Sequence, residues 1–463
     1  MVKQSSTQDE PAFRRRAFLA FAASASGAMA AIGAASATVF SRGIEDPRVV
    51  LDGPRTNARY FDGIYAARES GLYLDGVNDD LARLNQLIVS VHQSGGGSIV
   101  FPSAKVRLSG RVEMLSNVSL VGAGSEFTKF MYDDGGSFQL LYAPLCSQIK
   151  IRGIQFDGGK NNSLPTVSIA LDGCRDVVIE GCRFVNTKQS IFFVDSTQGS
   201  NHILIKDNVW EDVVDQAVRL DARGDADSVT VSGNLVKSVS PGVGGTAIAA
   251  FRLRGTNHSV IRNTVLGSFD TGVMVAGSGT SSVLIAENNL HTTKVGIFVG
   301  SSVRNVRIVG NDVASDEDFG IHLFDGQGQP EAAHSVYGNV IHDCGKSGIS
   351  VEGIRGFSIT GNTVTNCAST AQPSSTFDNW RAGLAVVSTS NGPCENYAIT
   401  GNVIRDNRAV PLMLDAIRIQ SAGKGATVVG NSVSGAIANS YNVSTGLSAP
   451  YYIQTDKGIL SSN

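Results

Sequence analysis

The chain has 463 residues, of which 42% are hydrophobic, 17% are charged and 52 are glycine, a balance that excludes an intrinsically disordered or coiled-coil protein. The formal net charge of -3 at pH 7 and the lack of any run rich in lysine and arginine argue against nucleic acid as the main partner. Six cysteines are too few for a disulfide scaffold, and none forms the C-x-x-C pair typical of a zinc site, so no metal centre is expected.

The N-terminal segment has the pattern of an export signal. Arg14, Arg15 and Arg16 precede Phe18, and residues 17–41 carry no charge and are rich in alanine, glycine and serine. This pattern resembles a twin-arginine leader, which directs folded proteins out of the cytoplasm. We expect a signal peptide over residues 1–37, and a periplasmic or secreted mature protein with no stable membrane insertion. The alternative is an uncleaved anchor, because the uncharged run is long enough to span a bilayer.

Residues 38–463 are expected to form one domain, with an N-terminal cap at about 70–115 and coils at about 116–440. In the cap, Asp75-Gly-Val-Asn-Asp-Asp80 precedes apolar residues at helical spacing from Leu81 to Val91, which predicts an N-capped amphipathic helix. A helix here would cover the first coil, whose strand edges would otherwise be unpaired. Gly95-Gly-Gly-Ser-Ile-Val-Phe-Pro102 and Ser116-Asn-Val-Ser-Leu-Val-Gly-Ala-Gly124 supply the first strands.

A repeat dominates the sequence from about residue 115 onward. Its template is apolar-x-apolar-x-Gly-Asn-x-apolar, as in Val306-Arg-Ile-Val-Gly-Asn311, and most copies follow each other after 23 to 29 residues. Alternation with a period of two on either side of Gly-Asn predicts strand, turn, strand, and the step suits one coil of three short strands. The fold class is therefore all-β, a right-handed parallel β-helix solenoid of about a dozen coils with an N-terminal capping helix.

Asparagine follows the glycine position nine times, and we interpret these residues as structural. The bend requires a positive φ, and identical amides about 4.8 Å apart in neighbouring coils can hydrogen-bond along the axis. The nine are Asn208, Asn234, Asn263, Asn288, Asn311, Asn339, Asn362, Asn402 and Asn431.

Two pairs of cysteines occupy equivalent positions in adjacent coils, Cys146 with Cys174 and Cys344 with Cys367. Each pair is expected to stack about 4.8 Å apart, inside the Cα range for a disulfide. Free thiols are favoured, because a protein exported in the folded state leaves a reducing cytoplasm.

The cap motifs and the repeat together resemble the bacterial β-helix proteins related to pectate lyases and polygalacturonases. The leader plus the repeat also resembles twin-arginine-exported β-helix repeat proteins of unknown function. Polygalacturonases carry Asn-Thr-Asp, Asp-Asp, Gly-His-Gly and Arg-Ile-Lys motifs. In this chain Asn186-Thr-Lys188 lacks the acid, Asp215-Gln216 has lost one, Gly-His-Gly is missing, and Arg418-Ile-Gln420 has lost its lysine. The resemblance therefore implies the fold and a carbohydrate-related function, and speaks against polygalacturonase activity.

The strand after each Gly-Asn turn places residues in columns along the axis. Asp270, Lys294 and Asp318 share the turn column on consecutive coils, so we expect the two carboxylates about 9 to 10 Å apart with Lys294 between them. That separation suits an inverting glycoside hydrolase, whereas a lyase would use Lys294 as its base. His322 is expected to point outward beside them. The alternative is an inter-coil salt-bridge ladder without function.

Aromatic and charged residues of the neighbouring columns are candidates for substrate binding, because rings stack on sugar faces while charges provide contacts to acidic groups. A long coil after Gly361 contributes a loop that either walls a cleft or is a tolerated insertion. The candidates are Arg219, Asp221, Phe251, Phe298, Phe324 and Trp380, and the alternative is an ordinary solvated face.

The sequence thus leads to two hypotheses. The first is an exported polysaccharide lyase or glycoside hydrolase, with polysaccharide as its partner and with Ca²⁺ as a cofactor if it is a lyase. The second is a non-catalytic polysaccharide-binding or cell-envelope protein, because a fold does not dictate a function. The polysaccharide, the bond cleaved and the oligomeric state stay open.

Overall fold

The computed structural model describes residues 59–61, 63–132, 139–158, 167–194, 198–213, 215–220, 226–237, 249–267, 269–325, 331–369, 380–443 and 446–462. All of these residues belong to one compact unit, Asn57–Asn463, and the predicted signal peptide lies outside them.

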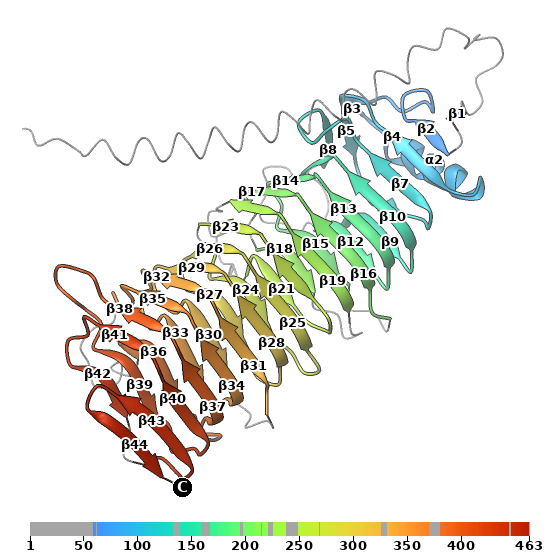
Figure 1. The fold of residues 1–463 in the computed structure, drawn as a ribbon. Coiled ribbons are helices and arrows are strands. Elements are labelled where there is room, and N and C mark those ends of the chain that lie inside the picture. The colour runs from blue at the N-terminus through green and yellow to red at the C-terminus, as the bar shows by residue number, and fades with distance from the viewer. Residues whose placement is uncertain are drawn as a thin grey trace, which may run out of the picture. The chain divides into compact units, whose positions relative to one another are not determined.

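This unit is a parallel β-helix of about 13 turns in which each coil contributes one short strand to each of three sheets (Figure 1). Neighbouring coils pair in parallel, and the antiparallel pairs β1–β2 and β43–β44 occur at the two ends. Sheet A comprises β1 (Arg59–Phe61), β2 (Ile64–Ala66), β4 (Gly97–Val100), β7 (Val118–Val121), β10 (Ser147–Arg152), β13 (Arg175–Glu180), β16 (Asn201–Lys206), β19 (Asp227–Ser232), β22 (Ser259–Ile261), β25 (Ser281–Ala286), β28 (Arg304–Val309), β31 (His334–Tyr337), β34 (Arg355–Thr360), β37 (Glu395–Thr400), β40 (Ala426–Val429), β43 (Tyr451–Thr455) and β44 (Gly458–Ser462).

The other two sheets follow in the same order along each coil. Sheet B comprises β3 (Asp75–Asp79), β5 (Ala104–Leu108), β8 (Thr128–Tyr132), β11 (Gln155–Asp157), β14 (Arg183–Val185), β17 (Val209–Glu211), β20 (Leu235–Lys237), β23 (Thr264–Leu266), β26 (Asn289–Thr292), β29 (Asp312–Ser315), β32 (Val340–His342), β35 (Thr363–Thr365), β38 (Val403–Arg405) and β41 (Ser432–Ser434). Sheet C comprises β6 (Val112–Glu113), β9 (Gln139–Pro144), β12 (Val167–Asp172), β15 (Gln189–Phe193), β18 (Gln216–Leu220), β21 (Phe251–Leu253), β24 (Thr271–Val275), β27 (Val295–Val299), β30 (Ile321–Phe324), β33 (Ile349–Glu352), β36 (Ala382–Val387), β39 (Asp415–Gln420) and β42 (Asn439–Val443).

A helix, α2 (Leu81–Gln93), forms where the sequence predicts one and buries Leu84, Leu87, Ile88 and Val91. The side chain of Asp80 does not cap it, contrary to expectation. Its buried carboxylate instead accepts hydrogen bonds from the backbone N–H groups of Tyr73, at 2.6 Å, and Leu74, at 3.0 Å. Asp80 therefore holds the preceding turn, and the role of the helix as a cap stays a prediction.

The asparagine ladder is confirmed. Eight hydrogen bonds of 2.9 to 3.1 Å run from the side-chain Nδ2 of each asparagine to Oδ1 of the next, from Asn208 to Asn431. Each Oδ1 also accepts the backbone N–H of the preceding asparagine, as Asn311 does from Asn288 at 3.0 Å. The bend before the ladder has the expected positive φ, 64° at Gly233 and 55° even at Glu287. The ladder fixes the register of one corner of every coil.

The cysteine stacks also follow the predicted register. Ser147 pairs with Arg175 and His342 with Thr365, which places Cys146 beside Cys174 and Cys344 beside Cys367 in adjacent coils. All four side chains are free thiols in the core. Burial raises the pKa of the Cys146 thiol to about 12, so this thiol is a poor nucleophile.

Two histidines, His258 and His334, occupy buried positions inside the core. We therefore expect the stability of the protein to fall in acid. Burial lowers the pKa of His334 to about 4, and it lowers the pKa of His258 as well. Nδ1 of His334 accepts the backbone N–H of Val306 at 3.3 Å, so the ring is neutral. The unfolded chain binds a proton at a higher pH than the folded protein does. The stability that comes from keeping these rings neutral is therefore fully present above pH 6.5 and is lost as the pH falls toward 4.

We expect His334→Phe to remove part of this acid sensitivity, because the side chain stacks in register on Phe357 of the next coil. The wild type should lose about 2 kcal/mol at His334 between pH 7 and pH 5, and the variant should lose that much less. Urea unfolding at both pH values measures the difference. Equal losses in the two proteins would contradict the assignment.

Candidate functional site

A depression of about 360 Å³ lies on the outer side of sheet C, over β24, β27 and β30. Five predicted site residues, Asp270, Lys294, Phe298, Asp318 and His322, line it together with four residues that were not predicted. The lining residues are Asp270, Thr271, Met274, Lys294, Val295, Phe298, Asp318, Phe319 and His322. The strand register brings these residues together. Thr271 pairs with Val295 and Ile297 pairs with Ile321, so the turn residues that precede the three strands stack in one column.

The charged residues of this column pair two by two. Lys294 Nζ lies 3.0 Å from Asp270 Oδ1, and Lys346 Nζ lies 2.6 Å from Asp318 Oδ1. Lys294 lies on the coil between the two acids, as expected, but its direct partner is Asp270, and that of Asp318 is Lys346 of the next coil. The hydrogen bond to Asp270, together with the charges of Asp270, Glu317 and Asp318, raises the pKa of Lys294. Lys294 is therefore a stable cation and a poor general base.

His322 and Glu352 form a second pair beside the column. His322 Nε2 lies 2.6 Å from Glu352 Oε1, and the two side chains are only 14% and 13% exposed. Ser350 Oγ donates a further hydrogen bond of 3.3 Å to the same oxygen. A carboxylate at Nε2 stabilises the tautomer with the proton on that nitrogen, which leaves the lone pair on Nδ1. Among the described residues Nδ1 has no hydrogen-bond partner.

Aromatic rings surround His322. Its ring centroid lies 4.5 Å from that of Phe319, 5.5 Å from that of Phe298 and 6.0 Å from that of Phe324. The ring of Trp380 packs edge to face against that of Phe319, with the ring centroids 5.3 Å apart. Phe298 and Phe324 therefore lie against His322, and Trp380 of the long loop reaches it through Phe319. Their role in substrate binding stays a prediction.

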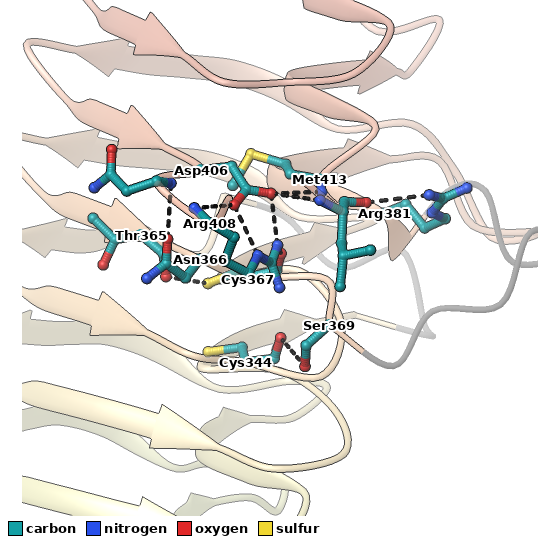
Figure 2. Close-up of polar contacts among 11 residues, drawn as sticks. Cys344, Thr365, Asn366, Cys367, Ser369, Arg381, Asp406, Arg408 and Met413 are labelled. Carbon is teal, nitrogen blue, oxygen red and sulfur yellow. Dashed lines mark hydrogen bonds and ion pairs between the residues drawn. The ribbon is translucent and has the colours of Figure 1, made fainter. Parts of the chain in front are cut away.

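The loop that follows β38 contacts Arg381, whose neighbour Trp380 is held by Ser347 (Figure 2 shows Arg381). Ser347 Oγ donates to the carbonyl of Trp380 at 2.9 Å, and Arg381 donates to the carbonyl of Leu412 at 3.2 Å. Inside the loop, the buried carboxylate of Asp406 accepts hydrogen bonds from Arg408 and from two backbone N–H groups (Figure 2). Burial opposes ionisation, but these hydrogen bonds lower the pKa of Asp406 to about 2. The carboxylate of Asp406 therefore stays ionised near neutral pH, and its hydrogen bonds hold the loop in place.

The remaining candidates have different outcomes. Arg219 lies on the outer face of β18, with its guanidinium 5.3 Å from the ring centroid of Phe192. Asp221 lies outside the described residues. Phe251 was predicted to face outward, and this is wrong, because its ring is buried in the core 6.5 Å from that of Trp210. The outward residue of β21 is Arg252, which pairs with Arg219 and Met274.

Sequence reasoning did not select Glu352, Lys346, Phe319 or Arg252. Glu352 follows Phe324 in one column and Lys346 follows Asp318 in another, so the repeat carried a signal for both. Phe319 carried no such signal, because the residues at its position in the two preceding coils, Thr271 and Val295, are not aromatic.

Two features are absent from the described residues. No group of three or more His, Cys, Asp and Glu side chains is placed to hold a metal ion there. Among the same residues we find no helix with the length and apolar character that crossing a bilayer requires.

Comparisons with known proteins agree with this architecture. Residues 148–331 match the family model described as periplasmic copper-binding protein (NosD), and residues 249–454 match the model described as right handed beta helix region. The mannuronan C5-epimerases AlgE1 and AlgE4 of Azotobacter vinelandii are 28% and 27% identical over 169 residues, which is 32% of this chain. That alignment spans 12% and 30% of their own lengths.

Two solved structures share the fold over most of their length. The A-module of A. vinelandii AlgE4 has a TM-score of 0.55 at 17% identity, over 83% of this chain and 98% of that one. The tailspike protein of E. coli bacteriophage HK620, solved in complex with a pentasaccharide, has a TM-score of 0.58 at 14% identity, over 85% and 81%. At these identities the likeness concerns the fold. The chain is therefore a right-handed parallel β-helix protein, built on the same solenoid as an epimerase module and a phage tailspike.

Proposed function

We propose that this protein acts on an acidic polysaccharide and that a uronate unit of the polymer loses its C5 proton in the depression beside His322. The observation that carries the proposal is the His322–Glu352 pair, held at 2.6 Å under a ring of aromatic side chains. An imidazole oriented by a carboxylate is the arrangement that enzymes use for a general base. The similarity to mannuronan C5-epimerases supports a uronate as the substrate.

Lys294 supplies the second requirement of this chemistry. Removing the proton next to a carboxylate builds negative charge on that carboxylate, and a fixed cation stabilises it. Because the pKa of Lys294 is raised, the ammonium persists near neutral pH and can bind the substrate carboxylate. The proposal therefore gives Lys294 the role of charge stabiliser and His322 that of base, in place of Lys294 as base.

Two reactions share this first step. In a lyase the carbanion expels the glycosidic oxygen at C4 and leaves an unsaturated uronate, whereas in an epimerase a proton returns from the opposite face. A Ca²⁺ ion as cofactor is not supported, because the described carboxylates do not gather into a ligand group. A hydrolase is not proposed, because Asp270 and Asp318, the two carboxylates expected for it, are each held by a lysine.

The test combines three readouts on a panel of polyuronates and neutral polysaccharides. Absorbance of unsaturated uronates indicates a lyase, deuterium incorporation at C5 in D₂O indicates an epimerase, and new reducing ends without absorbance indicate a hydrolase. Retained binding with none of the three would favour the rival, a non-catalytic polysaccharide-binding or envelope protein. Activity confined to neutral polymers would overturn the proposal.

The proposal includes export through the twin-arginine pathway to the periplasm or the exterior, on the pattern of Arg14 to Leu19. We expect the double replacement Arg15→Lys and Arg16→Lys to retain the protein in the cytoplasm, because the translocase recognises the arginine pair. Immunoblots of fractionated cells measure this, and Lys3→Arg is the matched control. Export that persists in a strain lacking the translocase would disprove the pathway.

A further inference from the structure

The outer face of sheet C carries one continuous strip that ends at the depression. Six outward side chains on consecutive strands, β15 to β30, are paired in register, and all of them are partly exposed. With strands about 4.8 Å apart, the strip is roughly 24 Å long. Its residues are Phe192, Arg219, Arg252, Met274, Phe298 and His322.

On the C-terminal side of His322, the residues of the same column are buried. Its next members, Ser350 and Ala385, are fully buried, and Arg418 is 3% exposed. Arg418 Nη2 lies 2.5 Å from Asp415 Oδ2 in a buried ion pair, and Asn442 Nδ2 donates to the same oxygen. The strip is thus accessible on the N-terminal side of His322 and closed on the C-terminal side.

The charges along the strip favour an anionic ligand. Arg219 and Arg252 are adjacent in register on its N-terminal half, and Arg219 stacks on the ring of Phe192. Guanidinium groups bind carboxylates with two parallel hydrogen bonds, and rings such as Phe192 and Phe298 offer apolar faces to sugars. Lys294 continues the cationic character at the depression.

We propose that the substrate is a polyuronate bound along the solenoid axis, with one chain end at His322 and roughly five sugar units over the strip toward β15. This inference rests on the proposed function and adds the length, charge and direction of the substrate. Since one pyranose unit is about as long as one strand spacing, each coil of the strip meets about one unit. The covered column beyond Ser350 confines the reaction to the end of the chain.

Length dependence is the first test. With the His322→Ala variant, which binds without turnover, titration calorimetry should show a trimannuronate bound at least about tenfold more weakly than a hexamannuronate. Adding Arg219→Ala and Arg252→Ala should reduce the ratio of hexamer to trimer affinity about tenfold or more. Arg304→Ala, at an exposed position in β28 on sheet A, is the control and should leave the ratio unchanged.

The second test locates the reacting unit. A hexamannuronate labelled at its reducing end, after limited conversion by the wild type, should carry the change in one terminal unit. Changes spread over internal units, or equal affinity for trimer and hexamer, would overturn the inference while turnover lost in His322→Ala still supports the proposed function. A length effect without any turnover would retain the inference and reject catalysis, and no binding of either oligomer would reject both.

Discussion

Replacing His322 by alanine is expected to lower kcat on the established substrate by roughly 10²- to 10⁴-fold, the usual contribution of a general base. The imidazole lines the depression and is oriented through Nε2 by Glu352, whereas the other titratable lining residues, Asp270, Lys294 and Asp318, are held in ion pairs. Glu352→Gln should lower kcat by a smaller factor, because an amide keeps a hydrogen bond but loses the charge that stabilises the imidazolium.

Initial rates and melting temperatures of both variants measure this prediction. His291→Ala is the matched control, because His291 is exposed on sheet B and bonds to Asp316 at 3.2 Å, as a surface residue. It should leave kcat unchanged. If His322→Ala retains more than a tenth of the wild-type kcat while folding normally, His322 is not the base.

Replacing Asn288 by alanine is expected to destabilise the protein by about 3 to 5 kcal/mol, because it leaves several buried polar groups unpaired. Oδ1 of Asn288 accepts both the backbone N–H and the side-chain Nδ2–H of Asn263, at 2.9 and 3.0 Å. Its own Nδ2 donates to the carbonyl of Val260 at 2.9 Å. Water does not reach these groups, since the asparagines of the inner coils are buried.

The matched control is Asn431→Ala at the end of the ladder. Asn431 makes the same bonds to Asn402, but it is partly exposed and water can replace it. We expect a loss of about 1 kcal/mol there. Urea unfolding of the two variants measures the difference, and equal losses would show that the ladder does not act through burial.

The repeat made much of the site predictable. Because Gly-Asn marks the same corner in each coil, counting from it placed Asp270, Lys294 and Asp318 in one column, as the strand register has them. The repeat did not predict which of two neighbouring lysines would pair with Asp318. Lys294 and Lys346 stand one coil on either side of Asp318, and side-chain rotamers decide which lysine contacts it.

The error at Phe251 has a specific cause. The run Thr246-Ala-Ile-Ala-Ala-Phe251 contains small apolar residues that fit either face of a strand, and the Gly-Asn marker lies far from it. Placing Phe251 on the outer face, where the register has Arg252, shifts the strand by an odd number of residues, and an odd shift reverses its two faces. The side chain of Glu352 was predictable in position but not in its contact with His322.

The corner that carries the ladder and the corner that carries the loops are different parts of each coil. Asn362 and Asn402 are 40 residues apart in the sequence, and the ladder hydrogen bond between them is 3.0 Å long. Asn311 and Asn339 are only 28 residues apart, and their hydrogen bond has almost the same length, 2.9 Å. Extra residues between sheets B and C therefore leave the neighbouring coils in place. Loops at that corner can therefore change in length and sequence while the pairing of the coils stays the same. A new binding specificity can evolve there without a change in the fold.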